Sequence, residues 1–261
     1  MLQAAMIDSS YLYISAFAFS AMVGGSLIGL FSARALPSHH LSRESADVVK
    51  TSTTIVATLT SLVLALMLSS ANSSFSINAG IVKKLSADLI QIDHLLRAYG
   101  SEANEARANL RAYAMRKSDE LFPGSTSTTA STAEETASLL DALLEGTLSL
   151  SLPDRRHTAL AAQALALINS IYAERWLLWE NPGTTVPPPF IFLLVFWLFL
   201  IFLSFGLFAP CNLTVITSFV LSALAVTGAL FLILELGDPM EGWLRVSGEP
   251  LRRALIEIGR P

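Results

Sequence analysis

FIFLLVFWLFLIFLSFGLF (residues 190–208) and LTVITSFVLSALAVTGALFLILEL (residues 213–236) are two apolar runs that carry no charge before Glu235. At about 1.5 Å per helical residue, each run is long enough to cross a hydrocarbon core of about 30 Å. The short segment APCN (residues 209–212) separates them, so they are predicted to form a tight antiparallel hairpin. The sequence therefore predicts a membrane protein.

A second pair of apolar runs lies near the N-terminus. Residues 11–31 hold no ionisable group except Tyr11 and Tyr13, which stand where an interfacial aromatic belt is expected. The run is not read as a secretory signal, because no basic region precedes it. Residues 54–71 are a shorter span that the uncharged stretch just before it can extend. We predict an all-α, multi-pass protein with four membrane helices in two hairpins, one in residues 1–72 and one in 190–236.

The composition agrees with a membrane protein. Hydrophobic residues make up 52% of the chain and charged residues only 15%, and the mean hydropathy is +0.55. Soluble proteins are seldom so apolar. The formal net charge of −4 offers no basic surface for nucleic acid, so no nucleic-acid partner is expected. The single cysteine, Cys211, excludes an intramolecular disulfide and a thiolate metal cluster.

The distribution of Lys and Arg predicts the orientation. With four spans, the termini and the long middle segment share one side of the membrane. Six basic residues near span ends fall on that side and three on the other: Lys83, Lys84, Arg175, Arg245, Arg252 and Arg253 against Arg34, Arg43 and Lys50. The bias predicts cytoplasmic termini and a cytoplasmic middle domain.

The middle segment, residues 73–189, has the pattern of a helical domain. Leu85, Leu89, Ile92, Leu96 and Tyr99 form one narrow helical stripe, which Gly100 ends. This stripe indicates either a coiled coil between subunits or a helix packed in its own bundle. We favour the bundle, because two heptads are few for a coiled coil. Residues 125–131 are predicted to be a flexible linker, Thr132 and Glu135 to form a capping box, and residues 237–261 to form a cytoplasmic tail.

Motifs that carry catalytic chemistry are missing from the sequence. It has no Gly-rich phosphate loop, no HExxH helix, no GxSxG elbow and no paired-cysteine motif. We therefore expect no enzyme, no cofactor and no metal site.

Small and hydroxyl-bearing residues follow one face of the second span. At 100° per residue they fall within about 60° of one line: Thr51, Thr54, Thr58, Ser61, Ala65, Ser69 and Asn72. Val56, Leu59, Val63, Leu66 and Met67 are assigned to the opposite side. Such a stripe can line a wet pore, or it can allow close helix packing. On the evidence of the stripe alone, we favour packing. Similar small-residue spacings, at Ala21, Gly25 and Gly29 and at Thr214, Ser218 and Ser222, indicate that the first and fourth spans also sit against protein.

Two carboxylates, Glu235 and Asp238, stand where the fourth span ends, followed by Pro239. Carboxylates at such a boundary are often simply interfacial, because the cost of burial falls near the headgroups. Alternatively, the pair could hold a cation or form a salt bridge with Arg245 or Arg252.

Several segments together resemble the bacterial bestrophin-like domain family, a group without an established function. They are SHHLS (38–42), DVVK (47–50), VATL (56–59), SSANSSF (69–75), LRAYG (96–100), FW (196–197), FGLFAP (205–210) and LILEL (232–236), with Pro239, Gly242, Arg245, Val246 and Ser247. The resemblance covers nearly the whole chain. It implies a distant similarity to bestrophins, which are oligomeric anion channels with four membrane helices per subunit, and a location in the bacterial inner membrane.

Departures from the bestrophin pattern limit that analogy. The dense acidic calcium clasp of bestrophins is reduced to Glu235, Asp238 and Glu241, and no aromatic run on the second span matches the bestrophin neck.

The sequence is therefore compatible with two functions. The first is a homo-oligomeric channel in the lipid bilayer for small inorganic ions, which are expected to be anions. Its expected pore-lining residues are Thr54, Thr58, Ser61, Ala65 and Asn72, with a C-terminal signature of Glu235, Asp238, Pro239 and Arg245. The second is a non-conducting membrane-anchored scaffold or sensor whose cytoplasmic domain binds a partner.

Overall fold

The computed structural model describes residues 2–37, 42–122, 129–180, 188–240 and 243–259, and every regular element in them is helical. The chain divides into two compact units. One, the apolar unit, holds residues 2–74 and 183–244; the other, the polar unit, holds residues 75–182 and 245–261.

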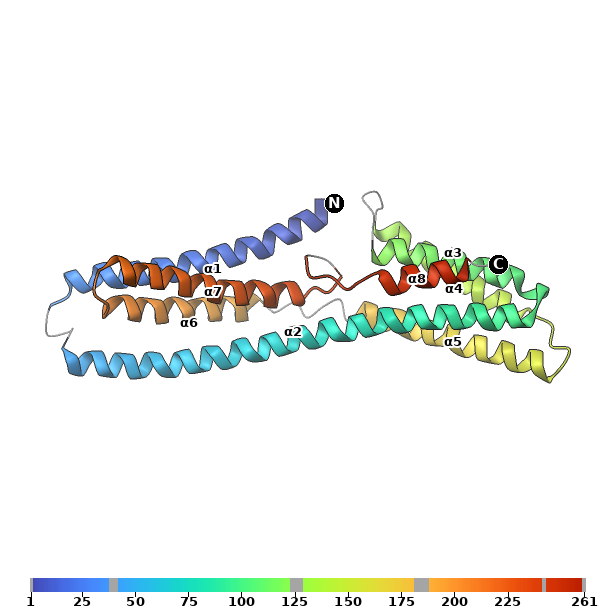
Figure 1. The fold of residues 1–261 in the computed structure, drawn as a ribbon, viewed down its shortest axis with the longest axis horizontal. Coiled ribbons are helices and arrows are strands. Elements are labelled where there is room, and N and C mark those ends of the chain that lie inside the picture. Colours follow the sequence, from blue (N-terminus) through green and yellow to red (C-terminus); the bar gives the residue numbers. More distant parts are fainter. Residues whose placement is uncertain (1, 38–41, 123–128, 181–187, 241–242, 260–261) are drawn as a thin grey trace. The chain divides into compact units, whose positions relative to one another are not determined.

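The apolar unit contains α1 (Leu2–Ala35), the first part of α2 (Arg43–Tyr99), α6 (Pro188–Leu207) and α7 (Leu213–Leu236). Helices α1, α6 and α7 run side by side (Figure 1). The side-chain oxygen of Asn212 accepts a hydrogen bond from the Val215 backbone N–H at 2.9 Å and so caps the start of α7. Among the described residues, four helices, α1, α2, α6 and α7, are long and apolar enough to cross a membrane.

Glycines bring α1 and α6 into backbone contact. A Cβ added to Gly206 would lie 2.0 Å from the carbonyl oxygen of Ser26, and one added to Gly29 would lie 2.2 Å from that of Leu203. A Cβ on Gly25 would lie 2.9 Å from the Phe199 carbonyl oxygen. The small-residue spacing of the first span is thus confirmed as a surface for close helix packing.

Helix α2 is continuous from Arg43 to Tyr99, whereas the sequence predicts a span at 54–71 and a separate helix that begins near Leu85. No proline interrupts residues 43–99, and the polar residues between the two parts are compatible with a helix, so nothing in the chain ends it earlier. The helix ends before Gly100, whose φ of 121° is a conformation that suits glycine.

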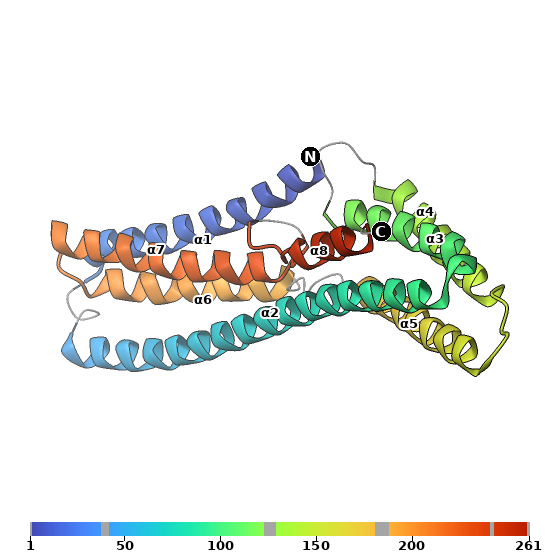
Figure 2. The ribbon, with the colours of Figure 1, turned by 45° about the vertical axis from the view of Figure 1, so that its right-hand side comes forward.

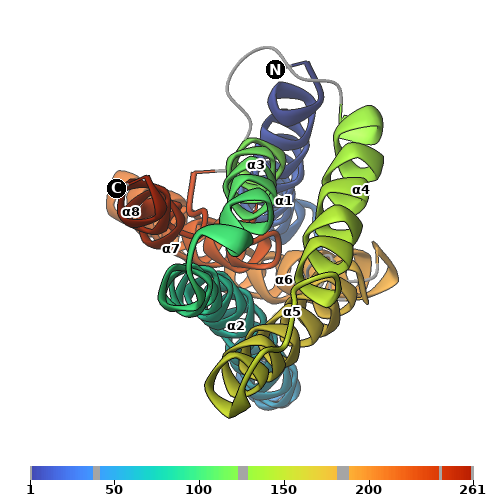
Figure 3. The ribbon, with the colours of Figure 1, turned by 90° about the vertical axis from the view of Figure 1, so that its right-hand side faces the viewer.

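The polar unit contains the second part of α2, η1 (Ser101–Ala103), α3 (Asn104–Leu121), α4 (Thr129–Leu148), α5 (Arg155–Glu180) and α8 (Glu249–Ile258). Figures 1 and 2 show α5 beside the second part of α2, and Figure 3 shows this unit after a 90° turn, with α5 crossing the view obliquely. The five-residue stripe that ends at Tyr99 is buried in the core of this unit. That burial supports the intramolecular bundle over a coiled coil between subunits.

Two predicted boundaries differ from the structure. Helix α4 begins at Thr129, so Thr132 and Glu135 do not form a capping box at its start. Of the predicted linker 125–131, residues 125–128 lie outside the described residues and 129–131 belong to α4. Within the segment assigned to a tail, α8 buries Leu251, Ala254 and Ile258 and contacts α3.

Candidate functional site

The hydroxyl and small-residue stripe of α2 is exposed along its whole length. Exposed side chains include all five expected pore-lining residues, Thr54, Thr58, Ser61, Ala65 and Asn72. On the other side of the helix, Thr60, Ala71 and Ser74 are buried. In its most apolar window only 11% of α2 is buried, against 39% for α1. Ser61 also lines a crevice between α2, α6 and α7, but the rest of the stripe does not pack against the described helices of its own chain.

The stripe's hydroxyl groups bond to the backbone of their own helix. Thr54 donates to the carbonyl oxygen of Lys50 at 2.8 Å, Thr58 to that of Thr54 at 2.9 Å, and Ser61 to that of Ala57 at 2.9 Å. This pattern is common for Ser and Thr inside helices. Each of these three hydroxyls thus donates within its own helix, and its oxygen can still accept a hydrogen bond from water or from another subunit.

An apolar stripe borders the hydroxyl stripe on the exposed side of α2. Ile55, Leu59, Leu62 and Leu66 are 60%, 48%, 56% and 63% exposed. Leu59 and Leu66, which are predicted to lie on the face opposite the hydroxyls, are exposed as well, for a physical reason. At 100° per residue they lie at the edge of that face, beyond the reach of α1, α6 and α7. Val56, Val63 and Met67 are partly buried, as expected.

The small-residue stripe of the fourth span is also exposed rather than packed. Thr214, Ser218 and Ser222 are exposed in α7. Ser218 and Ser222 line a crevice between α2, α6 and α7. This crevice consists of two adjoining cavities of about 290 and 400 Å³, which share Phe205, Ser218 and Phe219.

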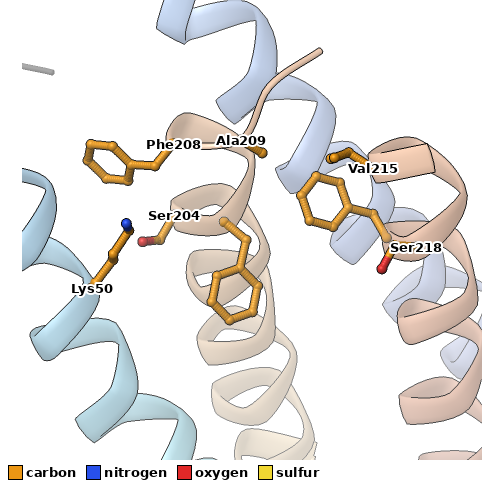
Figure 4. A pocket seen from close by; sticks show the side chains of 8 residues that line it. Lys50, Ser204, Phe208, Ala209, Val215 and Ser218 are labelled. Carbon is orange, nitrogen blue, oxygen red and sulfur yellow. The ribbon is translucent and has the colours of Figure 1, made fainter. Parts of the chain in front are cut away.

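One end of the crevice is polar. Figure 4 shows the Lys50 ammonium group and the Ser204 hydroxyl turned toward each other, with Phe208 beside them. Thr53 donates a hydrogen bond to Ser204 Oγ at 2.8 Å and so joins α2 to α6 at this end. Lys50 is the only charged residue among the described residues that line the two cavities.

The C-terminal signature begins with a buried carboxylate. Glu235 is 1% exposed, and its Oε2 accepts hydrogen bonds from the backbone N–H groups of Trp243 and Leu244 at 2.8 and 3.4 Å. Backbone N–H groups thus bond to this carboxylate oxygen, for which Arg245 or Arg252 was a predicted partner. Arg252 instead pairs with Glu249 inside α8.

Asp238 Oδ2 accepts a hydrogen bond from Tyr11 Oη at 3.4 Å, which links the end of α7 to α1. Pro239 follows it directly, and Arg245 is exposed in the polar unit. A salt bridge between Arg245 and either carboxylate stays a prediction. Glu241 and Gly242 lie outside the described residues, as do residues 38–41 of the N-terminal signature.

A charged cluster joins α2 to α5 in the polar unit. Lys84 Nζ lies 2.6 Å from Glu174 Oε1 and 3.6 Å from Asp88 Oδ2. Glu174 is 3% exposed. Burial raises the pKa of the Glu174 carboxyl, and this effect outweighs the hydrogen bond from Lys84 that lowers it. The same hydrogen bond is the main cause that raises the pKa of Lys84.

Sequence reasoning missed Thr53 and Glu174 as members of these sites and did not place Lys50 in the crevice. Thr53 and Ser204, or Lys84 and Glu174, are far apart in the chain, so no local pattern pairs them. The helical period does show Thr53 and Thr60 on the face opposite the stripe, and this was the available signal. Within the described ranges, no group of three or more His, Cys, Asp or Glu residues could hold a metal ion.

These features define a class of helical membrane protein. It has four apolar helices long enough to cross a membrane and a helical polar unit, and one long helix, α2, contributes residues to both units. The sequence profile of the Bestrophin-like domain matches residues 20–251, so the chain belongs to the bestrophin-like family. The expected family membership is confirmed.

Two solved structures have a similar fold. One is a bacterial bestrophin homologue from Klebsiella pneumoniae in which one tryptophan is replaced by alanine, at 18% identity and a TM-score of 0.67, covering 96% of this chain and 99% of that one. The other is a membrane protein in which one proline is replaced by alanine, at 16% identity and a TM-score of 0.64, covering 95% and 99%. Comparison with curated proteins finds no match.

Proposed function

We propose that the protein is an oligomeric membrane ion channel that conducts small inorganic anions, with the α2 stripe lining the pore. The observation that carries this proposal is the exposure of the stripe from Thr54 to Asn72. A helix in a membrane that leaves a hydroxyl face uncovered by its own chain must place that face against lipid, another subunit or water. Lipid is the least favourable of these for hydroxyls and the Asn72 amide, because hydrocarbon offers them no hydrogen bonds.

The neighbouring apolar stripe supports a ring. If several copies surround an axis with their hydroxyl stripes facing it, Ile55, Leu59, Leu62 and Leu66 lie to one side of the axis. There they would contact α2 of the next copy. The hydroxyl stripe would then face water and the apolar stripe would contact the next subunit. A closed ring needs both kinds of surface on each subunit.

Lys83 supports the preference for anions. It is exposed, and by helical spacing it continues the stripe about three turns beyond Asn72. Three other basic side chains near the span ends contact other groups or line another site. Lys84 pairs with Glu174, Lys50 lines the crevice, and the Arg34 guanidinium lies 5.6 Å from the centre of the Phe31 ring. Rings of basic side chains select anions when they face the path.

The orientation proposed here follows the Lys and Arg count. Both termini and the polar unit are cytoplasmic, so that Lys83 belongs to the cytoplasmic mouth and Asp47 to the opposite one. The membrane is the bacterial inner membrane.

Ion flux through purified protein in liposomes tests this function. Wild-type protein should conduct chloride above protein-free liposomes, and Thr58→Leu and Ser61→Leu should lower the flux at least tenfold by filling the path. Val63→Leu adds bulk to the partly buried face and is the matched control. It should leave conduction per folded oligomer unchanged.

Charge substitutions test the anion preference separately. Lys83→Glu should shift the reversal potential toward that of potassium, whereas Asp47→Asn should not. If the wild-type protein passes no ion, or if both leucine variants conduct like wild type, the stripe is a contact surface. The scaffold or sensor would then be the better account.

A further inference from the structure

The crevice between α2, α6 and α7 has the chemistry of a lipid site. Its walls are mainly aromatic and aliphatic, including Phe202, Phe205 and Phe219, and its polar lining consists of hydroxyls apart from Lys50. Its two cavities, of about 290 and 400 Å³, together fall in the range of about 300–1,000 Å³ that is typical of ligand pockets. An occupant must therefore be largely apolar, with one polar end.

The position of the charge indicates the sign of that polar end. Lys50 lies beside Phe208 and Ala209, where α6 has ended, so its ammonium group lies near the end of a candidate span and not at mid-depth. No ion pair in the described part of the chain involves Lys50. An anionic group at this end would meet the ammonium and the Ser204 hydroxyl together (Figure 4).

We propose that this crevice binds an anionic phospholipid. The headgroup phosphate lies at Lys50 and Ser204, and an acyl chain lies along the aromatic wall toward Ser222 and Val226. A free phosphate would satisfy Lys50 but leave the apolar wall uncovered, and a zwitterionic lipid would cover the wall but gain less at Lys50. This proposal does not depend on ion conduction, and a non-conducting protein could have the same site.

Lipid retention by the purified full-length protein tests the proposal. The protein is mixed in detergent with phosphatidylglycerol or phosphatidylcholine of the same acyl chains, and bound lipid is counted by native mass spectrometry. Wild-type protein should prefer phosphatidylglycerol roughly fivefold, the effect expected of one basic side chain near a membrane surface. Lys50→Gln should abolish this preference.

Arg43→Gln is the matched control. Arg43 is exposed two turns before Lys50 on the same face of α2 and does not line the crevice. It should keep the preference, which separates the site from general surface charge. Ser218→Phe fills the point that the two cavities share and should lower retention of both lipids, and Ser222→Phe replaces it if that variant fails to fold.

Three results would overturn the proposal. They are equal retention of the two lipids by wild-type protein, an unchanged preference in Lys50→Gln, and an equal loss of preference in Lys50→Gln and Arg43→Gln. A wild-type protein that retains neither lipid, and whose oligomer dissociates in Ser218→Phe, would assign the crevice to a neighbouring copy of the chain.

Discussion

Gly206→Ala is expected to weaken the packing of α6 against α1. The added Cβ would lie 2.0 Å from the Ser26 carbonyl oxygen and 2.9 Å from its carbonyl carbon. Real Cβ atoms essentially never come closer than 3.0 Å to such atoms, so the helices would have to separate by at least about 1 Å. The obstacle is backbone, which no side-chain rotation relieves.

The expected cost follows from two opposing effects. Alanine favours a helix over glycine by about 0.5–1 kcal/mol. Overpacking a close contact costs about 1–3 kcal/mol, or more where the backbone must move. The variant should therefore lose about 1–2 kcal/mol net, or roughly 2–8 °C in melting temperature for a chain of this size.

Thermal unfolding in detergent, followed by circular dichroism, measures this loss. Gly24→Ala is the matched control, because Gly24 lies in α1 next to this contact and a Cβ there meets nothing within 4 Å. It should leave the melting temperature unchanged or slightly higher. Equal melting temperatures for Gly206→Ala and Gly24→Ala would refute the close packing of α1 and α6.

Three further predictions concern the buried carboxylates and the orientation. Glu235→Leu should lower the free energy of unfolding by about 1–2 kcal/mol, because the backbone N–H groups of Trp243 and Leu244 lose their acceptor, and Glu235→Gln should lose less; similar stability of the two variants in chemical denaturation would contradict this. Because the pKa of Glu174 is raised in the folded protein, its contribution to stability is present below the ordinary carboxyl pKa and is lost as pH rises through the raised value. Glu174→Gln should therefore flatten the pH dependence of the melting temperature over that window, and an unchanged slope would exclude the effect. In a Cys211→Ser background, a cysteine at the exposed residue Ser149 should react with an impermeant reagent only after cells are opened, and labelling in intact cells would reverse the orientation.

Much of the helical framework could be predicted from the sequence, because it depends on local pattern. The fourth span, α7, begins and ends where the apolar run does, at Leu213 and Leu236. Helix α2 ends before Gly100, because the positive φ there suits glycine. The continuity of α2 was missed because its polar middle suggested a boundary, although a helix needs no hydrophobicity to continue. Helix α8 was missed because its apolar face is short and is buried only by packing in the polar unit.

The candidate sites were less predictable, because they depend on which faces remain uncovered. Spacing alone located the stripe at Thr58 and Ser61 but could not distinguish packing from exposure, since both need small or hydroxyl side chains. The crevice depends on Lys50 lying close to Ser204, and the burial of Glu235 depends on the backbone turn that brings the Trp243 N–H to it. Such long-range contacts have no periodic signature in a single sequence.

A structure of the purified protein, assembled in detergent or lipid nanodiscs, tests the central claim most directly. The account predicts a ring of identical subunits around an axial cavity, with Thr58 and Ser61 of every copy facing the axis and Leu59 and Leu66 against a neighbouring α2. A monomer, a dimer without an axial cavity, or a ring in which the stripe faces lipid would contradict it.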